Sequence, residues 1–441
     1  MRRSIIVVGL AFGDEGKGSW VDHLVRKYGA RFVVRFNGGA QAAHHVTTRD
    51  GLVHCFRQFG SGMLVPGVHT VLTRFMLIEP QALLDEAADL QWLGVKHPLE
   101  RLIVSEDAPV IAPFNRLFNG IREIARGRER HGSCGFGVGI TQDDVETLGE
   151  RALYVRDLKE GWQLLDKLVW LWRLRVDQAK EFECAGNKDL CDKLAKVDLC
   201  YYAELFRHFY CRARVVAEDE LLSIVRDNDT VFEGAQGVML DQKFGTFPHC
   251  TRSNCTTENA LAILRDARFA GQITRVGLLR GYGTRHGAGP FVTEDPQLAV
   301  PACDNGTNPW QGKFRVGWFD AVAARYALRA TGGVDVLAVT NLDRMAGLPS
   351  IKVATRYQNG DPRFFSPDGQ MLDVGTSHLE WLRARTASMM SISPGYIELP
   401  GWSAHDASGA LRYCQSLSEA IGQPVTACSL VADDRKTYFD D

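Results

Sequence analysis

The amino-acid sequence predicts an α/β fold, a single large domain in which a mainly parallel central sheet is flanked by helices. Short apolar, β-branched runs alternate with stretches of helical periodicity, and strands separated by helices favour parallel pairing. No long linker or internal repeat divides the chain, so we expect residues 1–441 to form one domain. The runs expected to be strands are residues 5–8, 31–36, 230–233, 273–279 and 334–340.

The first expected strand leads into residues 9–20, which read GLAFGDEGKGSW and open an expected helix. Glycines let the backbone pass close to a ligand, the helix points its N-terminus at that ligand, and Lys17 adds a positive charge. The stretch therefore predicts a phosphate-binding loop. It differs from a P-loop of the form GxxxxGK[ST], because Ala11 and Gly18 stand at the first and last positions of that pattern.

Asp14 and Glu15 stand in this loop, at the place where phosphates would bind. Their negative charge would repel a phosphate unless a metal ion intervenes or a carboxylate takes a proton from the substrate. We interpret Asp14 as a residue that takes part in the chemistry. The alternative is a solvated acidic turn that only caps the following helix.

Two further loops carry side chains suited to a ligand. After the strand at 31–36 comes NGGAQAAHH at 37–45, a small-residue loop with two histidines. Pro80 then opens a helix with an apolar stripe that is expected to face the core. Residues 131–139, HGSCGFGVG, suit a loop wrapped round an anion, although a plain surface loop has the same composition.

Residues 154–229 have a helical, charged pattern that indicates no site chemistry. The next strand ends in a glycine turn with polar Glu233 and Gln236 at its carboxyl end, where open α/β sheets bind ligands. Gln236 can offer both a donor and an acceptor to a purine edge. Polar loops at 280–285 and 341–344 follow the last two expected strands. The aromatic residues of the helical stretch are expected to pack in the core, and they include Trp162, Trp170, Trp172, Tyr201 and Tyr202.

Composition and charge exclude several classes of protein. With 51 Lys and Arg against 53 Asp and Glu, the net charge of -2 leaves no basic footprint for nucleic acid. No apolar run reaches the length of a membrane span, and the N-terminus lacks the apolar segment of a signal peptide. We therefore expect a cytoplasmic protein that binds neither nucleic acid nor membranes.

Eight short motifs are spread in order along nearly the whole chain. They are GDEGKG at 13–18, VRFNGG at 34–39, FEGAQG at 232–237, DQKFGTFPHCTRSN at 241–254, YGTRHGAGPFVTE at 282–294, GWFD at 317–320, TNLDR at 340–344 and PGWS at 400–403. With these motifs the chain resembles the adenylosuccinate synthetase family, whose members are ligases that join aspartate to a purine nucleotide. The resemblance implies a single α/β domain with a large central sheet, in agreement with the pattern above.

The resemblance implies a reaction in two steps. Oxide is a poor leaving group from purine C6, so the 6-oxygen would first attack the γ-phosphate of GTP or ATP, and the amino group of L-aspartate would then displace phosphate. Asp14 would take the N1 proton, His44 would stabilise charge on the transferring phosphoryl group, and Lys17 would hold the triphosphate. Asp14 would also bind Mg²⁺, with Ala43 as a second ligand.

The resemblance further implies a set of nucleotide-binding residues and a homodimer. Gln236 and Thr251 match residues that contact the acceptor nucleotide in the family. Ser133 falls in the family's phosphate loop. Asp343 matches the residue that reads the donor base, where a carboxylate favours guanine. Arg151 lies near the position of an arginine that reaches the other subunit's nucleotide. The implied nucleotide-binding positions are Gly13, Glu15, Gly16, Gly18, Gln41, Ser133, Arg151, Gln236, Thr251, Arg315, Asn341 and Asp343.

Three loops depart from the family pattern. QAAHH at 41–45 stands where the family usually has NAGHT, although His44 keeps the catalytic position. Cys134 and Phe136 stand where the family usually has Thr and Arg. Residues 432–435 read ADDR in place of the GPDR that lies beside the donor base, which leaves the identity of the donor open.

The loop that binds aspartate in the family also differs. It is rich in arginine in the family, whereas residues 308–315 read NPWQGKFR here and hold only the cations Lys313 and Arg315. Two carboxylates normally favour paired guanidinium groups. How this chain would hold L-aspartate is therefore open.

Two nucleotides, IMP and dGMP, are candidates for the acceptor. The departures, together with FRQFGSG at 56–62, resemble the phage branch of the family that acts on dGMP to make a 2-aminoadenine precursor. That branch typically has serine in place of the catalytic aspartate, and the presence of Asp14 here favours IMP.

Two other classes of protein are alternatives to a ligase. One is a P-loop-like nucleotide switch, which would need Ser or Thr at Gly18, and the other is a catalytically inactive regulator.

Overall fold

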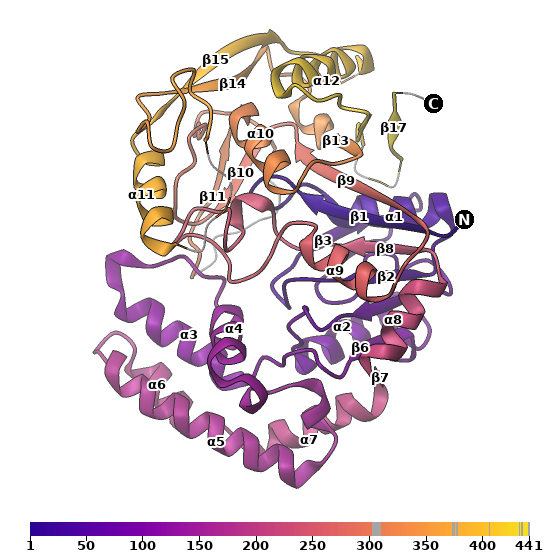
Figure 1. Ribbon diagram of the computed structural model, residues 1–441, viewed down its shortest axis with the longest axis vertical. Coiled ribbons are helices and arrows are strands. Elements are labelled where there is room, and N and C mark those ends of the chain that lie inside the picture. The colour runs from indigo at the N-terminus through magenta and orange to yellow at the C-terminus, as the bar shows by residue number, and fades with distance from the viewer. Residues whose placement is uncertain are drawn as a thin grey trace.

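A ten-stranded sheet forms the centre of the computed structural model (Figure 1), which describes residues 1–301, 310–372, 375, 378–404, 406–431, 433 and 435–439. Neighbouring strands are parallel except for the antiparallel pair at one edge. In spatial order the strands are β17 (Thr437–Tyr438), β16 (Ala427–Cys428), β13 (Val336–Thr340), β9 (Gln272–Arg280), β1 (Arg3–Gly9), β8 (Thr230–Glu233), β2 (Phe32–Arg35), β5 (His69–Leu72), β6 (Leu102–Ser105) and β7 (Arg214–Val216). The predicted mainly parallel central sheet is confirmed.

The strands expected from the sequence lie side by side in the middle of this sheet as β13, β9, β1, β8 and β2. Central strands of a parallel sheet are covered on both faces, so they read as nearly continuous apolar runs. Because these strands are parallel, their carboxyl ends all point to the same side of the molecule, where the loops that follow them come together.

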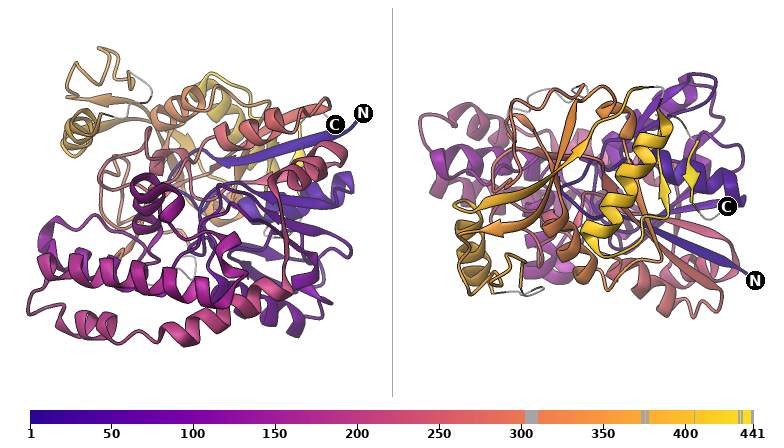
Figure 2. Two further views of the ribbon diagram at one scale, coloured as in Figure 1. Left: turned by 60° about the horizontal axis from the view of Figure 1, so that its bottom comes forward. Right: turned by 90° about the horizontal axis from the view of Figure 1, so that it is seen from above.

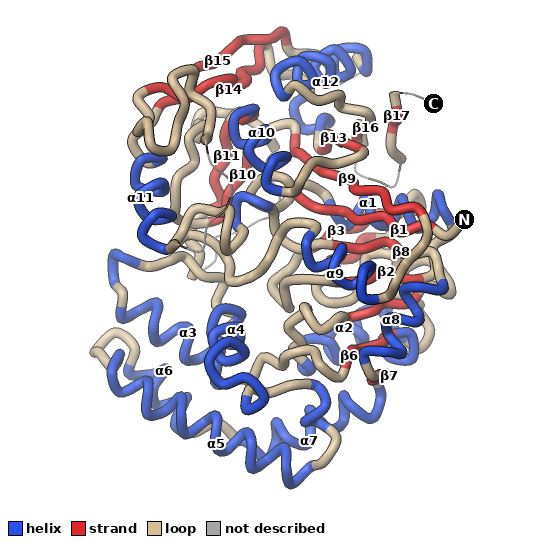
Figure 3. Tube along the Cα trace, viewed as in Figure 1, coloured by secondary structure: helices blue, strands red, loops and turns tan. Residues whose placement is uncertain are grey.

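Helices cover both faces of the sheet (Figure 3). On one face α1 (Lys17–Tyr28) packs against Ile5 and Val7 of β1. On the other face Ile6 and Val8 belong to a larger apolar core. Alternate residues of β1 thus face opposite cores, as expected for a buried strand. The helices that contribute to the larger core are α8 (Glu218–Asp227), α9 (Glu258–Asp266), α10 (Ala321–Ala330) and α12 (Ala407–Ile421).

A second group of helices gathers at the lower end of the molecule in Figure 1 and is seen from another side in Figure 2. These helices build an apolar core of their own with strands β5 and β6. None of the described helices is both long enough and apolar enough to cross a membrane. The group consists of α2 (Pro80–Trp92), α3 (Pro113–Ala125), α4 (Val138–Leu148), α5 (Gly161–Ala179), α6 (Lys188–Ala195) and α7 (Leu199–Arg212).

The expected helical stretch at 154–229 contains α5 to α8 and the short strand β7. The prediction that its aromatic residues pack in the core is wrong for Trp162 and Tyr201, whose side chains are 69% and 51% exposed. The buried stripe of α5 runs through Leu164 and Leu168, and Trp162 lies off that stripe at the start of the helix. An aromatic residue in a helical stretch therefore does not by itself mark the core.

Two segments expected to be loops contain strands. The histidines of the 37–45 loop begin β3 (His44–Thr47), which pairs with β4 (Val53–Phe56). The loop after β9 continues into β10 (Gly283–His286), which pairs with β11 (Phe314–Gly317). These strands are short and polar, so they lack the apolar alternation by which strands are recognised. The remaining elements are β12 (Phe319–Asp320), β14 (Ser350–Gln358), β15 (Ser393–Pro400) and α11 (Leu379–Met389).

Candidate active site

A large cavity of about 1050 Å³ opens at the carboxyl ends of the central strands. Its wall comes from the loops that follow β1, β2, β8, β9 and β13, together with the loop before α4. The implied site residues that line it are Gly13, Asp14, Gly16, Lys17, Gly18, Gln41, Ala43, His44, Ser133, Gln236, Thr251, Asn341 and Asp343. The structure therefore brings together most positions that the sequence indicated, from segments far apart in the chain.

Residues 9–18, called here the phosphate-loop segment, are held in shape by Glu15. Its Oε1 accepts hydrogen bonds from the backbone amides of Ala11 at 3.1 Å and Gly13 at 2.8 Å, and its Oε2 lies 2.7 Å from Lys17 Nζ. Gly16 takes the left-handed conformation, with φ 77°, that starts α1 at Lys17. Glu15 is fully buried and is not part of the cavity wall, so its side chain supports the loop from behind and does not face a nucleotide.

Replacing Glu15 by glutamine is expected to destabilise the fold and to weaken triphosphate binding. The change would leave the buried Lys17 ammonium without its counter-ion, and breaking a buried ion pair costs about 3–5 kcal/mol. Denaturant unfolding with and without GTP measures both effects. The exposed Glu100, replaced in the same way, serves as the control and should unfold like the parent chain. Equal unfolding curves for the two variants would contradict the expectation.

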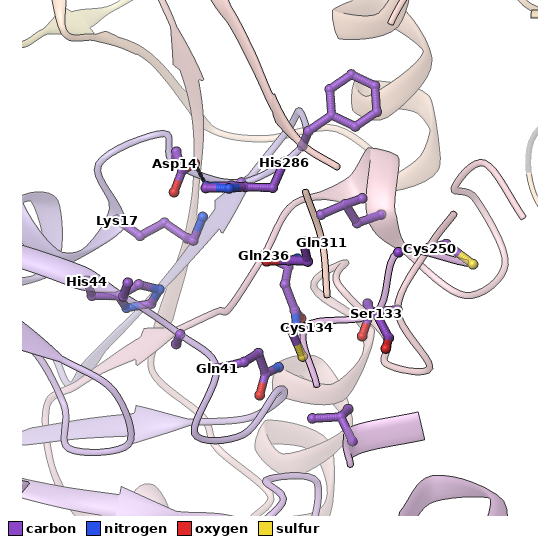
Figure 4. A pocket seen from close by; sticks show the side chains of 18 of the residues that line it. Asp14, Lys17, Gln41, His44, Ser133, Cys134, Gln236, Cys250, His286 and Gln311 are labelled. Carbon is purple, nitrogen blue, oxygen red and sulfur yellow. Dashed lines mark ion pairs between the residues drawn. The ribbon is translucent and has the colours of Figure 1, made fainter. Parts of the chain in front are cut away.

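Asp14 projects from this loop into the cavity. Its backbone is in the left-handed region, with φ 62°, and its Oδ2 lies 3.0 Å from Nε2 of His286 (Figure 4). Arg280 Nη1 donates to the Asp14 carbonyl oxygen at 3.2 Å. Burial alone would raise the pKa of the Asp14 carboxyl, but His286, Arg280 and Lys17 together lower it below its ordinary value. The group is therefore ionised at neutral pH and able to accept a proton.

His44 faces the cavity from the start of β3 and is fixed from behind by Glu233. The distance from His44 Nδ1 to Glu233 Oε1 is 2.6 Å, and the Glu233 carboxylate also accepts hydrogen bonds from the backbone and hydroxyl of Ser61. Burial lowers the pKa of His44 to about 4, against the opposing charge of Glu233. Nδ1 thus donates to Glu233, and Nε2 is the ring nitrogen left for a ligand.

Close packing brings His44 next to the phosphate-loop segment. A Cβ atom at Gly18 would lie 2.9 Å from the Cβ of His44, so glycine is required there for α1 and β3 to approach. In Figure 4, Asp14, Lys17 and His44 lie on one side of the cavity, and Ser133 and Cys250 lie on the other. A phosphoryl group on the first side would face a carboxylate, an ammonium and an imidazole.

Polar groups suited to a nucleotide line the rest of the wall. The buried amide atoms of Gln41, a residue of the cavity wall, have no hydrogen-bond partner among the described residues, so their hydrogen-bonding capacity is unused in this structure. Gln236 has a left-handed backbone, φ 60°, and both Gln236 and Thr251 line the wall. The hydroxyl of Ser133 accepts a hydrogen bond from Asn119 Nδ2 at 2.9 Å.

The end of β13 forms a separate part of the wall, next to the phosphate-loop segment. Thr340 Oγ1 donates to the Glu15 carbonyl oxygen at 2.9 Å, which ties β13 to that segment. Asn341 follows in the left-handed conformation, φ 57°, and Asp343 lies on the short 3₁₀ turn after it. Burial raises the pKa of the Asp343 carboxyl, with Arg344 opposing the rise.

Two of the implied nucleotide-binding arginines lie outside the cavity wall. Arg315 forms an ion pair with Glu294 and donates to the carbonyl oxygens of Gly287 and Gly289, both at 2.9 Å. Arg151 is exposed, with its guanidinium 4.1 Å from the centre of the Trp170 ring. In this structure the Arg315 side chain therefore serves the β10–β11 hairpin. The sequence shows the residue types but not these partners.

Other cations do line the cavity. Arg122 from the end of α3 and the neighbouring Arg126 lie in the wall near His131, although no motif marks them. Arg126 pairs with Glu123 at 2.5 Å, and Arg122 lies 3.6 Å from Asp143. Of the departures in the sequence, Asn308 and Pro309 of the 308–315 loop lie outside the described residues, as do Ala432 and Asp434.

The donor set fits Mg²⁺ that arrives with a triphosphate. Mg²⁺ prefers oxygen ligands and is normally held by one or two carboxylates together with substrate phosphates. Asp14 offers a carboxylate from the phosphate-loop segment, and Ala43 lines the same cavity. Across the described part of the chain no group of three or more His, Cys, Asp or Glu side chains could hold a metal ion by itself.

The sequence model of adenylosuccinate synthetase matches residues 6–438. The chain belongs to the adenylosuccinate synthetase family. It is 31% identical to the adenylosuccinate synthetase of Vibrio vulnificus over 463 residues, which cover 99% of this chain and 98% of that protein. It is 32% identical to that of Thermosynechococcus vestitus, over 99% of this chain and 94% of that protein. Members of this family are ligases that form a carbon–nitrogen bond, and the resemblance drawn from the motifs is confirmed.

Solved structures share the fold. Fully ligated adenylosuccinate synthetase from Plasmodium falciparum superimposes with a TM-score of 0.75 at 21% identity, over 98% of both chains. The succinoaminodeoxyadenylate synthetase of cyanophage S-2L, bound to dGMP and dATP, gives a TM-score of 0.56 at 16% identity, over 99% of this chain and 95% of that one. These two proteins thus share the fold described here.

Two residues acquire a place in the site only from the structure. The sequence puts Glu233 at a strand end but indicates no partner for it, and His286 lies inside a family motif without an assigned role. Their partners, His44 and Asp14, are distant in the chain. The position of Glu233 at the carboxyl end of β8 is a signal that it lies near a ligand site, but only the fold reveals the pairing.

Proposed function

We propose that this ligase joins L-aspartate to the 6-oxo carbon of a purine nucleoside monophosphate, driven by GTP or ATP through a 6-phosphoryl intermediate, with IMP as the favoured acceptor. The observation that carries the proposal is the convergence of Asp14, Lys17 and His44 at the phosphate-loop segment. The cavity of about 1050 Å³ exceeds the usual range of about 300–1,000 Å³ for one small-molecule site. A cavity of this size supports a site that takes more than one ligand.

Each of the three residues would have a distinct part. The ionised Asp14 would accept the N1 proton of the acceptor, so that O6 can attack the γ-phosphorus. Lys17 would hold the triphosphate and His44 would face the phosphoryl group in transfer. The amino group of aspartate would then attack C6 as the C6–O bond breaks, and phosphate would leave with both electrons of that bond.

The finer features of the proposal concern the cofactor, the location and the assembly. Mg²⁺, held by Asp14 and the Ala43 carbonyl, would supply charge neutralisation on the phosphates. We also propose a cytoplasmic homodimer in which Arg151 reaches the partner's nucleotide. The exposed position of that guanidinium supports a role towards a second subunit.

A second candidate acceptor is dGMP. The departures at Cys134 and Phe136, and the few cations in the 308–315 loop, support it through their resemblance to the phage branch. The 2-amino group of guanine would lie beside N1 and therefore close to the Asp14 carboxylate. The assay with the acceptor nucleotides decides between the two.

The test is incubation of the full chain with Mg²⁺, L-aspartate, GTP, ATP and one acceptor at a time from IMP, dIMP, GMP and dGMP. Mass spectrometry then reads which nucleotide gains a succinyl group. Product from IMP supports the favoured reaction, and product from dGMP supports the second candidate. Product from none of them would overturn the proposed reaction in favour of a nucleotide switch or a regulator.

Replacing Asp343 by asparagine is expected to lower the preference for GTP over ATP by about 10- to 100-fold, since a charged hydrogen bond to the base is lost. A carboxylate can accept two N–H bonds from guanine, whereas an amide offers one acceptor and one donor. The ratio of kcat/KM for the two donors measures the effect. If the ratio stays that of the parent chain, Asp343 does not read the donor base.

A further inference from the structure

The catalytic carboxylate of the proposed reaction is held by a residue from a distant part of the chain. His286 Nε2 lies 3.0 Å from Asp14 Oδ2, and the two side chains are 28% and 27% exposed at the cavity wall (Figure 4). An ionised carboxylate can only accept a hydrogen bond, so the hydrogen lies on Nε2 of the imidazole. The pair joins the loop after β1 to the end of β10.

His286 itself is well supported. It is the last residue of β10 and pairs with Phe314 of β11, and the two ring centres are 4.9 Å apart at an interplanar angle of 57°. The hairpin is further fixed by Arg315, which bonds to the carbonyl oxygens of Gly287 and Gly289 just after His286. The imidazole therefore has little freedom to follow a moving partner.

Asp14, by contrast, stands on a loop and in a left-handed conformation, with φ 62°. Arg280 bonds to its backbone carbonyl at 3.2 Å, which fixes the main chain but not the carboxylate. Among the ion pairs of the described chain, the contact with His286 is the one that engages Asp14 Oδ2. It leaves Oδ1 as the oxygen open to a ligand.

We propose that His286 is a positioning residue for Asp14, which orients the carboxylate so that one oxygen faces the proton that the acceptor must lose. This inference rests on the proposed function, because it assumes that Asp14 acts on the acceptor. It adds a residue whose contribution is geometric. A misplacement of about 1 Å in a reacting group can cost about 10²-fold in rate.

The competing explanation is that His286 only packs against Phe314. Two substitutions separate these roles. His286→Phe keeps an aromatic ring against Phe314 but removes the donor, whereas His286→Gln keeps a side-chain N–H donor but removes the ring. His208, which is exposed on α7 and outside the cavity wall, provides the matched controls His208→Phe and His208→Gln.

The experiment measures transfer of the γ-phosphoryl group, the step in which Asp14 acts in the proposed reaction. Positional isotope exchange in GTP labelled with ¹⁸O, with the acceptor present and aspartate absent, reports reversible transfer of the γ-phosphoryl group. Steady-state kcat and the KM for each substrate report the whole reaction. Calorimetric titration with GTP gives a binding readout that does not depend on turnover.

The expected result is that His286→Phe slows isotope exchange and lowers kcat by about tenfold or more, with GTP binding unchanged, whereas His286→Gln stays within about threefold of the parent chain. The reverse order, with His286→Gln impaired and His286→Phe normal, would overturn the inference in favour of ring packing. Equal rates in both variants and the parent would also overturn it while leaving the proposed function intact. A parent chain with no exchange and no succinylated product would overturn the proposed function and this inference with it.

Discussion

Replacing Asp14 by asparagine is expected to lower formation of the succinylated nucleotide by about 10²–10⁴-fold, the usual contribution of a general base. Asparagine has nearly the same shape and can still accept the hydrogen bond from His286. It cannot take the N1 proton, so O6 of the acceptor stays a poor nucleophile. Initial rates of product formation, read by mass spectrometry, measure the loss.

Triphosphate binding gives the control within the same variant. Lys17 and the backbone of the phosphate-loop segment keep their places, so we expect the Kd for GTP to stay close to that of the parent chain when measured without acceptor. Asp189, which is 77% exposed on α6, provides a substitution of the same kind that should leave the rate unchanged. Turnover at the parent rate in Asp14→Asn would mean that another group removes the N1 proton.

The centre of the fold could be predicted from the sequence, and its edges could not. Strands β1, β2, β8, β9 and β13 are buried on both faces, and their apolar runs give a clear signal. Strands β16 and β17 have two residues each and β7 has three, which is too short for any periodicity to show. Their pairing is decided by the neighbouring strands and helices rather than by their own residues.

The residues of the site also fall into a group that the sequence could predict and a group that it could not. Loop residues such as Lys17 and Gln236 could be predicted because glycine turns at the ends of central strands mark a ligand site. The hydrogen-bonded pairs could not be predicted, because Glu233 and His286 lie far along the chain from His44 and Asp14. Contacts of this kind depend on how the loops are arranged by the whole sheet.

The arginine residues show most plainly which property of a site residue cannot be predicted from the sequence. Arg315 matches a ligand-binding position by sequence, but Glu294 forms an ion pair with it inside the hairpin. Arg122 and Arg126 line the cavity without belonging to any motif. The charge of a side chain can be read from the sequence, whereas its availability to a ligand depends on the partners that folding supplies.

His44 is the second residue whose loss should have a large effect, and the reason lies in its two ring nitrogens. Nδ1 is held by Glu233 at 2.6 Å, so the ring presents Nε2 to the cavity. The Glu233 carboxylate is buried, and Arg35 and His44 lower its pKa to about 2 against the effect of burial. The negative charge behind the ring would stabilise a proton on Nε2 when a phosphoryl group lies in front of it.

Replacing His44 by asparagine is expected to lower product formation by about 10²–10³-fold, the usual effect of removing one group that stabilises a charged transition state. The asparagine amide can reach Glu233 in place of Nδ1 but cannot reach the cavity. Replacing His44 by glutamine places an amide N–H near the position of Nε2, so part of the rate should be retained. Initial rates and isotope exchange in the two variants measure the difference.

Glu233→Gln completes the comparison, because it keeps the hydrogen bond to the ring and removes the negative charge. If orientation alone matters, this variant should turn over nearly as fast as the parent chain, and His44→Gln should be the more active of the two His44 variants. If the charge of Glu233 also supports the ring, Glu233→Gln should fall between the parent and His44→Asn. A fully active His44→Asn would exclude His44 from the phosphoryl-transfer step, since neither Nε2 nor a substitute for it would then be present.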